Sequence, residues 1–181
     1  AARLREAEER VAATAGGRDA AATLLRPTLV YGGGGDRNLS RIAALARRHG
    51  LFVLPHDARG RRQPVHVDDL ADAALAALDG PGRGLRAFDL PGGEALAYRD
   101  MVARVLASLQ PPRRLWLLPG PLFSLAAWAA RALGVHDAGP AVLQRMREDL
   151  VFDAEPARRE LGYAPRGFEP EAWMFEGADP I

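Results

Sequence analysis

The sequence predicts an α/β fold, the C-terminal part of a doubly wound parallel sheet followed by a small, mostly helical lobe. A near-continuous apolar run at residues 23–31 is typical of a parallel strand that helices cover on both faces, and a later strand is expected at 87–90. Shorter apolar runs and stretches of helical periodicity alternate between them. Strands that alternate with helices in this way predict a parallel sheet for about the first ninety residues.

The first fifty residues contain a helix, a strand and a second helix. Residues 6–15 have the charged, amphipathic pattern of a helix that ends at Gly16-Gly17. The strand at 23–31 leads into a run of glycines, Gly32–Gly35, which predicts a mobile loop. Residues 39–49 are expected to form the next helix because apolar side chains recur on one face.

Shorter elements follow in the next forty residues. Short strands are expected at 51–54 and 64–67, and the second runs directly into a helix over 69–78. Residues 80–84 predict a turn because of their glycines and proline, and residues 87–90 predict a strand.

The second half is mostly helical in pattern. Pro111-Pro112 predicts a linker, and a short strand is expected after it at 115–118. Helices are expected at residues 98–109, 122–133, 140–149 and 156–161. These patterns divide the chain into residues 1–92, which hold the sheet, and residues 93–181, which form the helical lobe.

The composition excludes several kinds of chemistry. The net charge is +1 without a basic block, so we expect no nucleic-acid partner. All 24 basic residues are arginine, so the chain can form no Schiff base and supplies no lysine that could lower a tyrosine pKa. It also lacks cysteine, which excludes thiol catalysis, disulfides and Cys-ligated zinc and fits a cytoplasmic location. The first residues form a charged helix pattern without an initiator Met, which is typical of a piece of a longer chain.

One apolar stretch, residues 115–133, approaches the length of a membrane span. Pro119-Gly120-Pro121 is expected to break the helix near its start, and the remaining residues 122–133 would reach only about 18 Å. The sequence therefore predicts a buried or lid-forming helix and no stable membrane span. Membrane association through this helix is a weaker hypothesis, beside the two that are described below.

Residues 24–32, LLRPTLVYG, are the first segment that suggests a ligand. Ligands of open α/β sheets bind beyond the carboxyl ends of the strands. Pro27 has no N–H and a fixed φ, so it turns the chain out of the sheet and frees neighbouring backbone groups. An ordinary strand end that proline terminates is the alternative.

Residues 62–71, RQPVHVDDLA, form the second segment. His66 lies in a short apolar run and is expected to be a hydrogen-bonded core histidine. Asp68 is well placed as a helix N-cap, and Asp69 adds first-turn charge that the helix dipole favours. The four histidines lie far apart without ligand spacing, so no metal site is expected.

These two segments and residues 150–165, LVFDAEPARRELGYAP, resemble in their order the C-terminal half of an extended short-chain dehydrogenase/reductase, the NAD-dependent epimerase/dehydratase family. The resemblance implies a Rossmann-like fold, NAD or NADP as cofactor, and a small hydroxyl or carbonyl substrate that is sugar-nucleotide-like. It also implies that residues 1–92 include a substrate-loop insert, and that the enzyme forms a homodimer.

The resemblance assigns site residues as well. It places Pro27, Thr28, Leu29 and Val30 along the nicotinamide. It places Asn38 against a substrate diphosphate at the start of a helix, where N–H groups and the dipole attract anions.

It also gives Arg62 a charge-assisted contact to a substrate phosphate. The structural alternatives are a helix N-cap for Asn38 and a solvated basic loop for Arg62. An Arg-x-x-Asp element that sugar-nucleotide members add is missing after residue 80, and Pro64 replaces a common aromatic, which argues against a UDP-sugar.

The acid/base pair of the family, Tyr-x-x-x-Lys, is absent from these 181 residues. Tyr31 does not supply it because Gly35 stands at the lysine position, so we expect packing or gating there. If Glu8 takes the place of the family's glutamate, Leu4 takes the place of the lysine. Either the register slips and the pair lies upstream, or the pair is degenerate. We assign no catalytic residue and expect this piece alone to be inactive.

A degenerate pair would indicate a different class of protein. The alternative is a non-catalytic NAD(P)H-binding scaffold that resembles the accessory subunit of respiratory complex I. Leu4 and the apolar region 115–133 favour it, and such a protein would associate with a respiratory complex.

Overall fold

The computed structural model describes residues 2–17, 21–34, 36, 38–79, 84–132 and 140–175. Its helices are α1 (Ala2–Gly17), α2 (Leu39–His49), α3 (Val67–Leu78), α4 (Tyr98–Ser108), α5 (Gly120–Ala132), α6 (Pro140–Arg147) and α7 (Glu155–Leu161), with a 3-10 turn η1 (Ala172–Phe175). Its strands are β1 (Ala21–Pro27), β2 (Val30–Tyr31), β3 (Leu51–Pro55), β4 (Arg61–Arg62), β5 (Val65–His66), β6 (Gly84–Leu90), β7 (Leu96–Ala97) and β8 (Arg114–Leu118).

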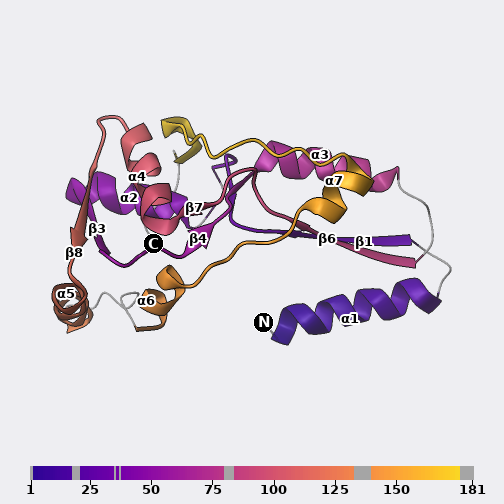
Figure 1. Ribbon diagram of the computed structural model, residues 1–181, viewed down its shortest axis with the longest axis horizontal. Helices are drawn as coiled ribbons and strands as arrows, with labels where there is room; N and C mark the ends of the chain where they lie inside the picture. The colour runs from indigo at the N-terminus through magenta and orange to yellow at the C-terminus, as the bar shows by residue number, and fades with distance from the viewer. Residues whose placement is uncertain are drawn as a thin grey trace.

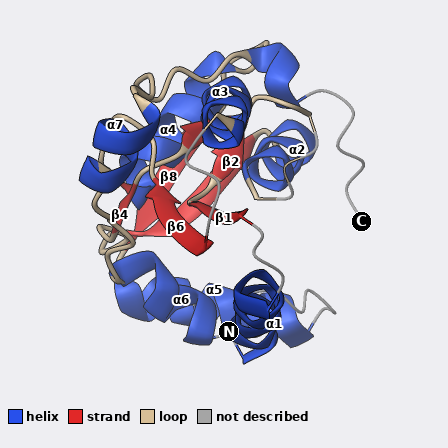
Figure 2. Ribbon diagram, turned by 90° about the vertical axis from the view of Figure 1, so that its right-hand side faces the viewer, coloured by secondary structure: helices blue, strands red, loops and turns tan. Residues whose placement is uncertain are grey.

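Parallel strand pairs dominate the described part of the chain, which confirms the predicted α/β class. β1 pairs with β6 in parallel from Ala21 opposite Gly84 to Pro27 opposite Leu90. The pairs β2–β5 and β3–β8 are also parallel, and β4–β7 is antiparallel. Helix α1 lies on one side of the β1–β6 pair, and α3 and α7 lie on the other (Figures 1 and 2). Helices therefore cover both faces of these strands, as their apolar sequences require.

The apolar run at 23–31 does not form the single strand that was expected. β1 ends at Pro27, and Val30 and Tyr31 form β2, which pairs with β5 instead of β6. Pro27 cannot donate to a strand ladder, so the chain leaves one partner there and reaches another two residues later. Thr28 and Leu29 lie at this crossing, where the Thr28 N–H donates to Leu90 O (3.4 Å) and Leu29 O accepts from the Val65 N–H (2.9 Å).

The second lobe is built around β3, β8, α2 and α4, at the other end of the molecule from β1 and β6 (Figure 1). Its buried core includes Leu39, Ala43 and Ala46 of α2, and residues of α4. The pairings β3–β8 and β4–β7 join strands from either side of residue 92. Residues 51–62 therefore pack with the segment after residue 93, and the division at residue 92 stays a prediction.

Several element boundaries differ from the expected ones. Helix α5 begins at Gly120, so Pro121 lies in its first turn, where proline is tolerated, and does not break it. Residue 133 lies outside the described residues, as do residues 80–83 of the expected turn and Gly35 of the glycine run. No helix in the described ranges is long and apolar enough to cross a membrane.

Candidate functional site

Two cavities adjoin where the chain leaves the carboxyl ends of β1 and β6. The first, which we call the lobe cavity, has a volume of about 440 Å³, and the second, the sheet cavity, about 640 Å³. Both volumes are in the range of small-molecule sites. Thr28 and Phe152 line both cavities, so the two hollows meet at these side chains. Ligands of open α/β sheets bind at the carboxyl ends of the strands, so this junction is the candidate site.

The lobe cavity brings together residues that are far apart in the sequence. Its lining residues are Thr28, Leu29, Asn38, Leu39, Ile42, Arg62, Gln63, Tyr98, Met101, Arg145, Met146, Leu150 and Phe152. Four of the six residues that the sequence singled out are among them. Of the other two, Pro27 lines the sheet cavity, and Val30 lines neither cavity because it packs against a second core cluster that contains Val65.

Arg62 lies at the lobe cavity, but its terminal nitrogens are already engaged. The side chain is 7% exposed. Its Nη1 donates to Arg61 O (2.8 Å) and Glu148 O (2.7 Å), and its Nη2 donates to Arg145 O. Two of these carbonyls belong to the C-terminal end of α6, so Arg62 satisfies groups that the end of a helix leaves open. The solvated loop considered as the alternative is wrong, since Arg62 is buried.

The N-terminus of α2 is capped by Asp36 instead of Asn38. Asp36 Oδ1 accepts from the backbone N–H of Asn38 (3.0 Å), Leu39 (2.6 Å) and Ser40 (3.2 Å). Its Oδ2 also accepts from the Ser40 hydroxyl (2.6 Å). The Asn38 side chain makes no capping hydrogen bond, so the expected N-cap role of that side chain is wrong. The N–H groups expected to attract an anion already hold a carboxylate.

Tyr98 and Gln63 are polar lining residues that the sequence analysis missed. The Arg62 guanidinium carbon lies 5.5 Å from the centre of the Tyr98 ring. Burial raises the pKa of the Tyr98 phenol, and the charge of Arg62 opposes this shift. Gln63 holds the junction in place, because its carbonyl accepts from the Thr28 hydroxyl and its side-chain Oε1 accepts from the Phe152 N–H (2.8 Å). Tyr98 begins a predicted helix, and nothing in its sequence pattern places it near Arg62.

The sheet cavity is bounded on one side by an ion pair between α1 and β1. Arg26 Nε and Nη2 donate to the two carboxylate oxygens of Glu8 at 2.9 and 2.7 Å. This hydrogen bond holds the pKa of Glu8 below its usual range. Glu8, Arg26 and Pro27 all line the cavity, so the Arg-Pro segment is fixed against the preceding helix.

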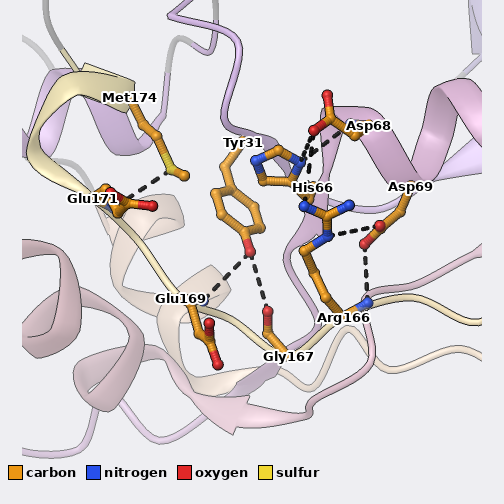
Figure 3. Close-up of polar contacts among 9 residues, drawn as sticks. All are labelled: Tyr31, His66, Asp68, Asp69, Arg166, Gly167, Glu169, Glu171 and Met174. Carbon is orange, nitrogen blue, oxygen red and sulfur yellow. Dashed lines mark hydrogen bonds and ion pairs between the residues drawn. The ribbon is translucent and has the colours of Figure 1, made fainter.

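A second group of polar residues, which we call the tail cluster, anchors the C-terminal segment (Figure 3). It consists of Tyr31, His66, Asp68, Asp69 and Arg166. The buried Tyr31 hydroxyl donates to Gly167 O (3.2 Å) and accepts from the Glu169 N–H (3.4 Å). Asp69 accepts from the Arg166 N–H (3.0 Å) and from Arg166 Nε (2.8 Å). Tyr31 therefore packs and anchors, as one of its two expected roles requires.

The N-cap of α3 is His66 and not Asp68, which the sequence had suggested. His66 is the N-cap of α3, and its Nδ1 accepts from the Asp68 N–H (3.2 Å). The expectation of a hydrogen-bonded core histidine is confirmed, while the expected capping role of Asp68 is wrong. A side chain on Gly32, whose φ is 100°, would collide with the His66 ring. Tight packing, rather than a loop that moves freely, explains this glycine.

Comparisons with known proteins agree with this architecture. Residues 3–89 match the family model described as the NAD dependent epimerase/dehydratase family. UDP-glucose 4-epimerase of Vibrio cholerae is 24% identical over 175 residues, which cover 94% of this chain and 51% of that protein. The 2-alkyl-3-oxoalkanoate reductase of Stenotrophomonas maltophilia is 29% identical over 186 residues, covering 88% of this chain and 51% of that protein.

A solved structure shows the same fold. It is the UDP-glucuronic acid 4-epimerase of Bacillus cereus in complex with NAD, with a TM-score of 0.58 and 15% identity over 85% of this chain and 44% of that one. Residues 3–89 therefore match an NAD-dependent epimerase/dehydratase domain, and the chain is similar to curated enzymes over most of its length. It spans about half the length of the curated relatives it matches. The expected dinucleotide cofactor, NAD or NADP, is the one this family uses.

Proposed function

We propose that the chain forms the substrate side of an NAD(P)-dependent oxidoreductase, epimerase or dehydratase that acts on a hydroxyl or carbonyl group. One observation carries this proposal: Thr28 and Leu29 line the same cavity as Asn38 and Arg62, and Thr28 also lines the adjoining sheet cavity. A dinucleotide and its substrate would meet at such a junction. Relatives are named for a nucleotide sugar and for an oxoalkanoate, and both are hydroxyl or carbonyl compounds.

The residues present fit a nicotinamide at this junction. Pro27 leaves the sheet there without an N–H, and the Arg26–Glu8 ion pair fixes the backbone before it. Pro27, Thr28 and Leu29 would hold the ring, and Val30 would support them from the core. A nicotinamide held there would supply hydride transfer to or from the substrate. The chain's own part is to bind and orient: Leu29 and Phe152 exclude water, and Asn38 and Tyr98 offer polar groups to the substrate.

The test is dinucleotide binding by the full-length protein, measured by calorimetry with NAD(H) and NADP(H). Thr28→Arg places a long charged side chain where the two cavities meet, and we expect it to weaken dinucleotide binding at least tenfold. Ser124→Arg is the matched control, because Ser124 is exposed on α5 and lines neither cavity. A full-length protein that binds neither dinucleotide would end the proposal.

The scaffold alternative gives a different pattern in the same assay. A full-length protein that binds dinucleotide but turns over no hydroxyl or carbonyl compound would favour it. Turnover by the full-length protein would exclude it.

A further inference from the structure

The body of the lobe cavity is apolar. Seven of its thirteen lining side chains are leucine, isoleucine, methionine or phenylalanine, and they come from α2, α4, α6, the Thr28–Leu29 crossing and the segment after α6. Met101 and Met146 face the cavity from two different helices. Methionine adapts its shape to varied apolar ligands, so these walls suit chains of different length.

The two groups expected to hold a diphosphate are both used within the protein. An anion that drew Arg62 away would leave the carbonyls of Arg145 and Glu148 without that donor, whereas Arg61 O would keep its hydrogen bond from the Leu150 N–H. Each buried carbonyl that loses its partner costs about 1–3 kcal/mol. At the start of α2, the Asp36 carboxylate occupies the backbone N–H groups and would repel a second anion.

Three polar side chains of the lining remain without a hydrogen-bond or ion-pair partner among the described residues: Asn38, Tyr98 and Arg145. An amide and a phenol can bind one hydroxyl or carbonyl oxygen, and a single arginine can pair with one carboxylate. Among the described residues, one cation and two neutral polar groups suit one carboxylate and one oxygen better than a nucleotide diphosphate.

We propose that the lobe cavity takes an aliphatic substrate with one hydroxyl or carbonyl group and at most one carboxylate, and that it does not take a nucleotide sugar. This inference rests on the proposed function, since it names the substrate class of the same cavity. The aliphatic chain lies against Ile42, Met101 and Met146, and a carboxylate pairs with Arg145 at the rim.

The test uses the full-length protein with 3-hydroxyalkanoates of four to ten carbons and, separately, UDP-glucose. Binding is measured by calorimetry with and without saturating dinucleotide. We expect the affinity for the acids to rise by up to about fourfold per methylene, the value for burying one CH2 group, until the cavity is filled. UDP-glucose is expected to bind at least tenfold more weakly than the longest acid.

A pair of neighbouring variants locates the site of binding. Leu150 is 46% exposed and lines the cavity, whereas Val151 is 37% exposed and does not. Leu150→Ser is expected to lower the affinity for the ten-carbon acid about tenfold, and Val151→Ser to leave it within twofold.

Three results would overturn the inference: affinity that does not depend on chain length, tighter binding of UDP-glucose, or no binding of any acid by protein that binds dinucleotide. Failure of dinucleotide binding itself would count against the proposed function instead. In that case the chain-length series without dinucleotide still decides whether the cavity is a site for aliphatic compounds.

Discussion

The tail cluster and the lobe cavity contain similar residue types but differ in how their polar groups are satisfied. In the tail cluster, Tyr31, His66, Asp69 and Arg166 all form hydrogen bonds within the protein. In the lobe cavity, Asn38 and Tyr98 have no such partner within the described ranges. Asn38 is exposed and Tyr98 is half-buried, so both side chains are available to a ligand in the lobe cavity, whereas the polar groups of the tail cluster are already used.

The largest expected effect on stability comes from a substitution that removes packing beside the tail cluster. Phe168 is 1% exposed and its ring centre lies 4.9 Å from that of Tyr31. Phe168→Ala should lower the free energy of unfolding by about 3–5 kcal/mol, because it leaves a cavity in the core. Urea denaturation of the full-length protein measures this. Trp173→Ala is the control, since Trp173 is 54% exposed, and it should change the value by less than about 0.5 kcal/mol.

A smaller effect is expected at Arg62. Substitutions there distinguish a side chain used in internal hydrogen bonds from one that contacts the substrate. Arg62→Gln removes the donors that hold the end of α6, and it should lower the free energy of unfolding by about 1–3 kcal/mol. Arg62→Lys should not restore it, because lysine lacks the planar fork. Amide hydrogen exchange in α6 should become faster in both variants. Unchanged stability, together with weaker binding of phosphate-bearing compounds, would instead support the substrate contact implied by the family resemblance.

The smallest expected effect separates capping from binding at the start of α2. Asp36→Ala should cost about 1 kcal/mol of stability, as other N-cap losses do, whereas Asn38→Ala should cost almost none. Thermal unfolding compares the two. Asn38→Ala is expected to weaken substrate binding without affecting stability, and equal destabilisation by both variants would contradict this assignment.

Local sequence patterns predicted the position of most helices and strands but not which strands pair with each other. Gly162 caps α7 in the left-handed conformation, a role that a glycine directly after a helix commonly has. The strand at 23–31 was expected correctly as an apolar run, yet it serves two different partners. Its periodicity could not show this, because a strand's partners come from distant parts of the chain.

For the candidate site, too, the sequence predicted several lining residues but not the hydrogen bonds that some of them make within the protein. Thr28, Leu29, Asn38 and Arg62 line one cavity, whereas Val30 does not, and the ligand-binding roles of all of them stay predictions. Asp36 as the cap of α2, and the carbonyls that occupy Arg62, were missed. Both depend on side-chain positions, and the second joins residues more than eighty positions apart.

By itself, the sequence determined the α/β class, the position of most helices, the family resemblance and the exclusion of lysine and cysteine chemistry. These follow from residue types and from spacing along the chain. Only the tertiary structure decided which polar groups are already satisfied, because that depends on distances between segments that the chain order does not set. The contrast between the engaged guanidinium of Arg62 and the Tyr98 hydroxyl, which has no hydrogen-bond partner among the described residues, belongs to this second kind of information.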